Sequence, residues 1–184
     1  MSDTKPAPTL YMSFDADQIG GRLFWHTWPD DRAVTGTLAG TLALPANAPL
    51  SLVVSGGGAV ASSANPEPFV GFDIKEFCVV SRPQIVARGP SHPVLQYAAP
   101  SPFAGHDTAC RSFRWEGGSQ DERTDDYLNV VKTLAKPLEL GAAGSWALSI
   151  LVTVAIYRKG PAQQAPIRVF AIDVEAELSA PAAR

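Results

Sequence analysis

The residues of this sequence best suited to bind a ligand form an aromatic stretch near the N-terminus, which reads Phe-Trp-His-Thr-Trp-Pro-Asp-Asp. Successive side chains of a strand point to opposite faces, so Trp25 lies on one face and Trp28 on the other, together with His26. One tryptophan is therefore expected inside the protein and the other outside. An exposed ring next to Asp30 and Asp31 suits a sugar, whose apolar face stacks on the ring while its hydroxyls bond the carboxylates.

Trp115, which stands between Arg114 and Glu116, is the candidate for a second aromatic platform. The alternative for all of these tryptophans is packing in the core or between sheets. Both interpretations stay open at the level of sequence. The candidate binding residues are Trp25, His26, Trp28, Asp30, Asp31 and Trp115.

Catalytic and metal-binding patterns are weak. His26, His92 and His106 are far apart and form no His-x-His or His-Glu-x-x-His pair. Asp15 and Asp17 alternate as calcium ligands do, but the EF-hand order of ligands and glycine is missing, so we expect solvated loop charges. We predict no metal, no cofactor and no enzymatic activity.

The two cysteines, Cys78 and Cys110, show no Cys-x-x-Cys spacing. We expect two reduced, partly buried thiols, because a disulfide needs an oxidising compartment that no sequence feature implies.

The composition limits the classes of partner that the protein is expected to bind. The 15 basic and 18 acidic residues leave a net charge of -3, which offers no basic excess for nucleic acid. No run of 18 apolar residues predicts a membrane span, and the polar N-terminus lacks the apolar core of a secretory signal, so we expect a cytoplasmic protein. Glycine (15) and proline (16) together make about a sixth of the 184 residues, which favours turns over long helices.

The elements that must position these residues are strands. Residues 145–157 alternate strictly between two faces, and residues 167–174 are again strand-like after a polar loop, which predicts a long antiparallel C-terminal hairpin. Residues 125–136 fit a short helix or a strand, and the strand is favoured because Pro137 closes the segment. Gly56-Gly57-Gly58 and Gly117-Gly118 are predicted to be turns. Further strands are expected at 9–14, 22–28, 36–44, 50–55, 69–80, 83–88, 94–98 and 112–116.

Eight or more strands without alternating helices predict an all-β fold, an antiparallel two-sheet sandwich with the last hairpin at its centre. We expect one domain over residues 9–178, with a disordered arm at 1–8 and a frayed tail at 179–184.

The C-terminal third also carries a family resemblance. Trp146, the alternating Leu148–Val154 and the segment Arg168–Glu175 resemble the closing hairpin of the bacterial PixA/AidA family, a group of inclusion-body and quorum-regulated β-sandwich proteins. In that family the final strand tends to end in aromatic-x-Asp-Pro. Here Asp173 matches and Val174 stands in place of the proline. The resemblance implies a non-enzymatic bacterial sandwich and transfers no catalytic residue.

Two functions are therefore expected. The first is binding or self-assembly through sheet edges or an aromatic patch, because a sandwich exposes edges that can pair with partners. The second is a carbohydrate-binding module built on the exposed tryptophan and nearby carboxylates.

Overall fold

The computed structural model describes residues 7–28, 41–60, 67–89, 92–160 and 165–179, and these residues form thirteen strands and no helix. The all-β prediction is confirmed. The strands are β1 (Thr9–Asp15), β2 (Phe24–Trp28), β3 (Thr41–Pro45), β4 (Pro49–Ala59), β5 (Phe69–Pro83), β6 (Ile85–Gly89), β7 (His92–Tyr97), β8 (Cys110–Phe113), β9 (Gly117–Arg123), β10 (Tyr127–Leu134), β11 (Leu138–Glu139), β12 (Gly144–Arg158) and β13 (Ile167–Ser179).

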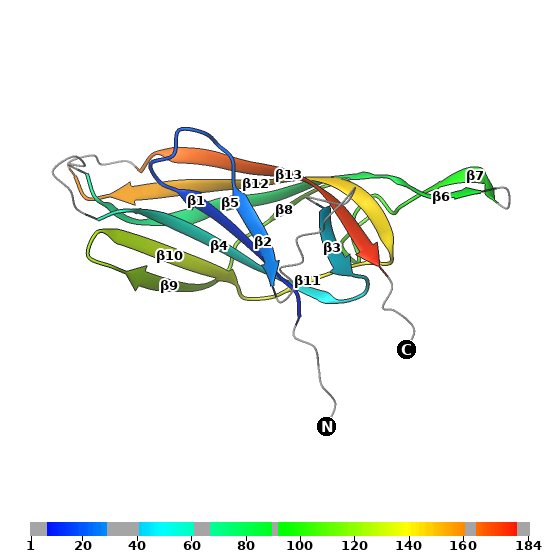
Figure 1. The fold of residues 1–184 in the computed structure, drawn as a ribbon, viewed down its shortest axis with the longest axis horizontal. Helices are drawn as coiled ribbons and strands as arrows, with labels where there is room; N and C mark the ends of the chain where they lie inside the picture. Colours follow the sequence, from blue (N-terminus) through cyan, green and yellow to red (C-terminus); the bar gives the residue numbers. More distant parts are fainter. Residues whose placement is uncertain (1–6, 29–40, 61–66, 90–91, 161–164, 180–184) are drawn as a thin grey trace, which may run out of the picture.

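Two sheets pack face to face as a sandwich (Figure 1). The first sheet has the order β2-β1-β4-β10-β9, with β11 paired to β4. The second sheet has the order β3-β13-β12-β5-β8. β6 and β7 form a separate two-stranded ribbon that extends from one end of the body (Figure 1).

The C-terminal hairpin lies at the centre of the second sheet, as predicted. β12 and β13 pair antiparallel from Gly144↔Leu178 to Ala155↔Ile167. The even-numbered side chains of β12 from Trp146 to Ile156 are all buried, because the two-residue period sends them to the inner face. Burial of this continuous apolar row provides the main driving force for packing the second sheet on the first.

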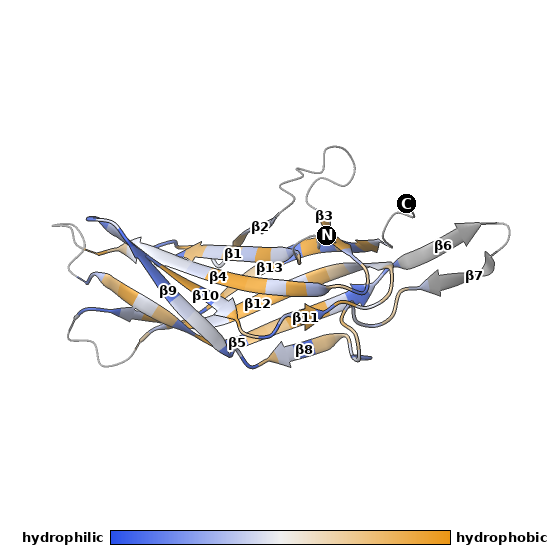
Figure 2. Ribbon diagram, turned by 90° about the horizontal axis from the view of Figure 1, so that it is seen from below, coloured by the Kyte–Doolittle hydropathy of each residue, from blue (hydrophilic) through white to orange (hydrophobic). Residues whose placement is uncertain are grey.

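Aromatic rings join the two sheets. Phe14 of β1 stacks on Phe170 of β13 with ring centroids 4.4 Å apart, and it meets Phe72 of β5 edge-on at 5.0 Å. Each of the three rings is nearly or fully buried. The apolar colouring in Figure 2 follows the same interior on strands of both sheets.

The predicted two-sheet sandwich is confirmed and most of its strand pairs are antiparallel, but each sheet also contains one parallel pair. β1 runs parallel to β4, and β3 runs parallel to β13. Neither pair is joined by a hairpin, and β3, which precedes β4 in sequence, belongs to the other sheet. A connection that crosses between sheets imposes no antiparallel direction.

The predicted turn at Gly56-Gly57-Gly58 is also wrong. All three glycines lie inside β4, which continues to Ala59. A Cβ on Gly56 would come within 2.5 Å of Phe14, and one on Gly58 within 2.7 Å of Phe69. The glycines are needed because aromatic rings from other strands occupy the space that side chains would fill.

Two further predictions concern the segment that follows β8. Residues 125–136, left open between helix and strand, contain strand β10, which pairs with both β4 and β9. Gly117-Gly118 was predicted to be a turn, but these residues begin strand β9. A Cβ on Gly117 would lie 1.8 Å from the carbonyl oxygen of Thr133, so the close approach of β10 explains this glycine.

The described part of the chain contains no helix with the length and hydropathy needed to cross a membrane. Most of the predicted arm at 1–8 and of the predicted tail at 179–184 lies outside the described residues. The same is true of residues 36–40 of the strand predicted at 36–44, of which β3 is the described part.

Candidate binding surface

β2 presents aromatic side chains on the outer face of the first sheet. Leu23, just before the strand, is fully buried, and Trp25 is partly buried against the core. Phe24 is 65% exposed, Trp28 is 49% exposed, and His26 between them is exposed as well. The predicted division of this strand into two faces is confirmed.

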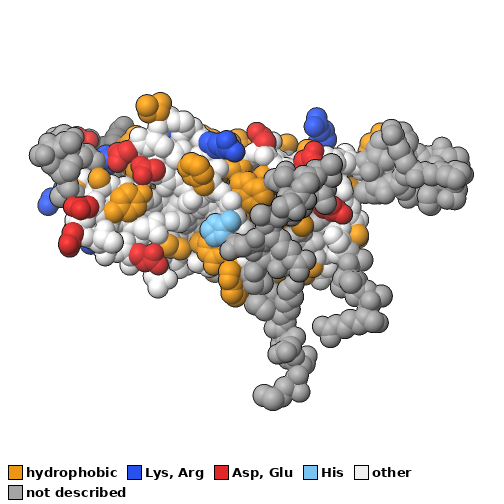
Figure 3. Space-filling view, in the orientation of Figure 1, with side chains coloured by type: hydrophobic (Ala, Val, Ile, Leu, Met, Phe, Trp, Pro, Cys, Tyr) orange, Lys and Arg blue, Asp and Glu red, His pale blue; other side chains and the backbone are white. Residues whose placement is uncertain are grey.

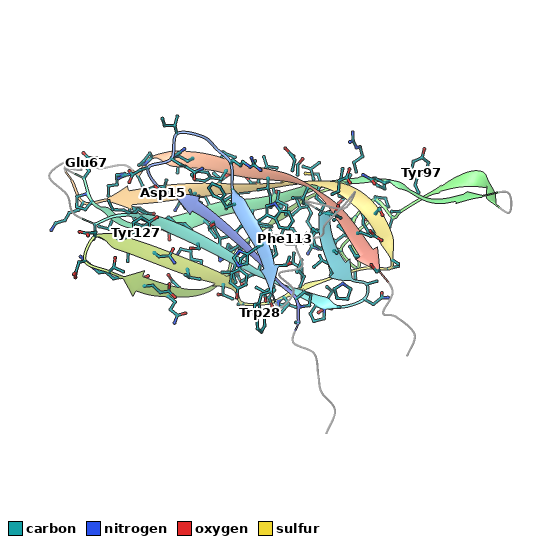
Figure 4. The ribbon with its side chains drawn as sticks, in the orientation of Figure 1. Asp15, Trp28, Glu67, Tyr97, Phe113 and Tyr127 are labelled. Atoms are coloured by element: carbon teal, nitrogen blue, oxygen red, sulfur yellow. The ribbon has the colours of Figure 1, made fainter. Side chains whose placement is uncertain are left out.

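A tyrosine from the neighbouring strand completes this surface. Tyr11 of β1 lies directly opposite His26 of β2, and their rings stack with centroids 4.8 Å apart and planes 3° from parallel. Figure 3 shows a histidine and hydrophobic side chains over β2 on this face, and Figure 4 places Trp28 at the end of the strand. We call Tyr11, Phe24, His26 and Trp28 the aromatic strip.

The remaining predicted binding residues do not complete the strip. Asp30 and Asp31 lie outside the described residues. Trp115 lies between β8 and β9, at the edge of the first sheet opposite to β2, and four strand spacings separate these edges by about 19 Å. Its ring packs against Phe77 of the core at 5.6 Å, so Trp115 forms no second platform beside β2.

Among the described residues, four strands lie at the edges of the two sheets, and they differ in what they expose. Every residue of β9 is exposed, and the strand includes Asp121, Glu122 and Arg123. Charged side chains on an edge oppose pairing with another chain. β8 has only four residues and carries Arg111, while β3 exposes only Ala43 and Pro45.

β2 differs from these three edges because it combines an uncharged sequence with large exposed rings. Within the described part of the chain it pairs only with β1. An uncharged edge strand with exposed aromatic side chains is the kind of edge that recruits another strand or a flat apolar ligand.

Asp15 and Asp17, which we predicted to be solvated loop charges, are engaged in protein contacts. Asp15 accepts hydrogen bonds from the Tyr127 hydroxyl at 3.0 Å and from the backbone N–H of Asp17 at 2.7 Å. Asp17 forms an ion pair with Arg158 at 2.5 Å. Among the described residues, no group of three or more potential ligands could hold a metal ion.

Two arginines fasten the loop after β1, which contains Asp17, to the second sheet. Arg158, at the end of β12, donates to the carbonyl oxygens of Ala16 and Glu67. Arg168, near the start of β13, donates to the carbonyl oxygens of Ala16, Ile19 and Gly20. The loop after β1 is therefore held by both strands of the C-terminal hairpin.

Tyr127 covers Gly57 on the outside of the first sheet. A Cβ on Gly57 would lie 2.3 Å from the tyrosine hydroxyl. Burial and the hydrogen bond to Asp15 raise the pKa of Tyr127 to about 12 from an ordinary value of 10.0. Because the pKa of Tyr127 is higher in the folded state, the protonated phenol favours the fold. Its contribution to the free energy of unfolding is fully present below about pH 10 and is lost as the pH rises towards 12.

We therefore expect the stability of the wild-type protein to fall over that interval, and the fall to be smaller in Tyr127→Phe. Urea unfolding at several pH values would measure this, and ultraviolet absorbance of tyrosinate would identify the late-ionising phenol. An equal pH dependence in the two proteins would contradict the assignment.

A hollow of about 370 Å³ lies on another part of the surface, where β8 meets the segment after β10. Arg111 is engaged there, since its guanidinium lies 4.0 Å from the centre of the Phe113 ring. Acidic and basic side chains both line the hollow, so its charge favours neither an anion nor a cation. Its ionisable residues are His106, Arg111, Arg114, Glu116, Lys136 and Glu139.

The chain matches no protein-family model, and no curated protein or solved structure is significantly similar to it. The resemblance to the PixA/AidA family therefore stays a prediction, and the functional argument rests on the geometry of the chain itself.

Proposed function

We propose that this protein is a non-enzymatic binding protein that self-associates through the edge of β2. The observation that carries the proposal is the contrast between the edges: β9 and β8 carry charges, β3 exposes little apolar area, and β2 exposes Phe24 and Trp28 without any charge.

A second copy of the chain fits this edge by symmetry. When two identical strands pair antiparallel around His26, Phe24 of each copy lies opposite Trp28 of the other. Directly opposed aromatic side chains stabilise a strand pair, and two such pairs would shield part of the surface of four exposed rings from water. The first sheets of the two copies then form one continuous sheet.

The test is the oligomeric state measured by sedimentation equilibrium over a range of concentrations. We expect a dimer in the wild type and, for Trp28→Lys, a dissociation constant at least about 30-fold higher, the equivalent of an interface hot spot of about 2 kcal/mol. The double variant Phe24→Lys with Trp28→Lys should weaken the dimer further, because each introduced positive charge would lie opposite another one on the second copy.

Gln120→Lys is the matched control, because it adds the same charge to the already charged edge strand β9. It should leave the dimer unchanged. Thermal unfolding of each variant separates loss of association from loss of the fold. A wild-type protein that stays monomeric at high concentration, or a Trp28→Lys variant that dimerises normally, would refute the proposal.

Carbohydrate binding is the second candidate, and the parallel stack of Tyr11 and His26 between the exposed rings of Phe24 and Trp28 favours it. The row of rings offers stacking surface to the apolar faces of sugar units. A glycan array probed with the wild type and Trp28→Ala distinguishes the two functions. Binding by a monomeric wild type that is lost in Trp28→Ala would favour the sugar over a second copy.

A further inference from the structure

The two cysteines, which the sequence predicts to be reduced and partly buried thiols, lie side by side in the second sheet. β5 pairs antiparallel with β8 so that Cys78 faces Ser112 and Val80 faces Cys110. Cys78 and Cys110 are therefore diagonal neighbours on one face of the sheet, and their sulfur atoms are 3.7 Å apart. The two cysteines are 32 positions apart in the sequence, which conceals this contact.

The position of the two thiols makes the pair accessible to a small reagent in solution. Cys110 is exposed and Cys78 is half-buried, so a small reagent reaches Cys110 first. A disulfide has its sulfurs about 2.04 Å apart, so the two atoms must approach by about 1.7 Å. Diagonal neighbours in a sheet have Cα atoms about 7–8 Å apart, which is the upper limit for a disulfide, so the bond needs a small backbone movement of β8 as well as rotation of the Cys110 side chain. Cys110 is also the first residue of β8, for which the described residues supply a pairing partner on one side only.

We propose that Cys78 and Cys110 form an oxidative modification site, at which a low-molecular-weight disulfide converts the two thiols into an intramolecular disulfide. The inference does not depend on the role of β2.

The chemistry is two successive thiol–disulfide exchanges. The Cys110 thiolate attacks the reagent, which breaks the reagent's S–S bond, forms a mixed disulfide and releases one thiolate. The Cys78 thiolate then attacks the Cys110 sulfur and releases the second thiolate. The protein loses two electrons and two protons, and the reagent gains both as two free thiols.

The new bond would close a loop of the chain that contains the β6–β7 ribbon, because the ribbon lies between Cys78 and Cys110 in the sequence. It would also fasten the short edge strand β8 to β5. Closing a loop of this length restricts the unfolded chain, and for a protein of this size the expected rise in Tm is on the order of 10 °C.

Oxidised glutathione is the probe, added to the folded, reduced full-length protein. Mass spectrometry after alkylation should find two labelled cysteines before oxidation. After oxidation it should find none, with no glutathione adduct and a peptide cross-linked through Cys78 and Cys110. The Tm of the oxidised protein should rise and should return after reduction.

Cys78→Ser is the matched control, because it keeps the exposed thiol and removes its neighbour. It should stop at a stable glutathione adduct on Cys110 with no comparable rise in Tm. A wild type that keeps two alkylatable thiols, retains the adduct, or forms only disulfides between molecules would overturn the proposal.

Discussion

Replacing Trp146 with alanine is expected to lower the free energy of unfolding by about 3–5 kcal/mol, the usual cost of truncating a fully buried aromatic side chain. Trp146 is 1% exposed and is among the largest side chains of the core. Its indole N–H also donates a hydrogen bond of 2.7 Å to the carbonyl oxygen of Ala99. In a protein of this size the loss corresponds to a decrease in Tm of about 6–20 °C.

Thermal and urea unfolding monitored by circular dichroism would measure this effect. Trp146→Phe keeps a ring in the cavity but removes the N–H donor, so its loss should be smaller. Val169→Ala provides the surface comparison, since Val169 is 52% exposed and substitutions at such positions usually change stability by less than about 0.5 kcal/mol. Equal losses at Trp146 and Val169 would show that the ring does not pack as described.

Gly56→Ala should have the second largest effect, although it adds a single methyl group. The new Cβ would lie 2.5 Å from Phe14 and 2.8 Å from Phe72, two rings that pack between the sheets. Inserting a methyl group into a filled core costs about 1–3 kcal/mol, so we expect Tm to fall by about 2–12 °C.

Gly118→Ala is the matched control, because a Cβ at that position meets no atom within 4 Å. Differential scanning calorimetry of the two variants gives the comparison. The double variant Gly56→Ala with Phe14→Leu should recover part of the loss caused by the added methyl group, because it shortens the side chain that is contacted. If Gly56→Ala proves as stable as Gly118→Ala, then the rings do not fill the space above β4.

Local alternation was sufficient to predict the strands whose inner faces are apolar. The pattern from Trp146 to Ile156 identified β12, and the alternation of Trp25 and Trp28 identified the two faces of β2. These predictions succeeded because a strand with one buried face repeats every two residues whatever lies opposite.

Predictions failed where the meaning of a residue depends on a distant strand. Gly56-Gly57-Gly58 suggests a turn until Phe14, Phe72, Phe69 and Tyr127 are known to cover it. The parallel pairing of β1 with β4 and the contact between Cys78 and Cys110 likewise depend on strand order, which local sequence patterns do not encode.

The candidate site was predicted in part. The exposure of His26 and Trp28 follows from the period of β2, but Tyr11 was missed because it belongs to β1, and only strand pairing brings it under His26. Trp115 was grouped with the other tryptophans by residue type, whereas the sheet order separates them.

Arg158 and Arg168, which hold the loop after β1, affect how the protein tolerates high ionic strength. Five of their six hydrogen bonds end on backbone carbonyl oxygens and only one ends on a carboxylate. Dissolved ions screen the attraction between two full charges more than a hydrogen bond to a fixed dipole. We therefore expect these hydrogen bonds to persist at high ionic strength as well as in dilute buffer. Lysine, which lacks a planar fork of donors, could not replace either arginine.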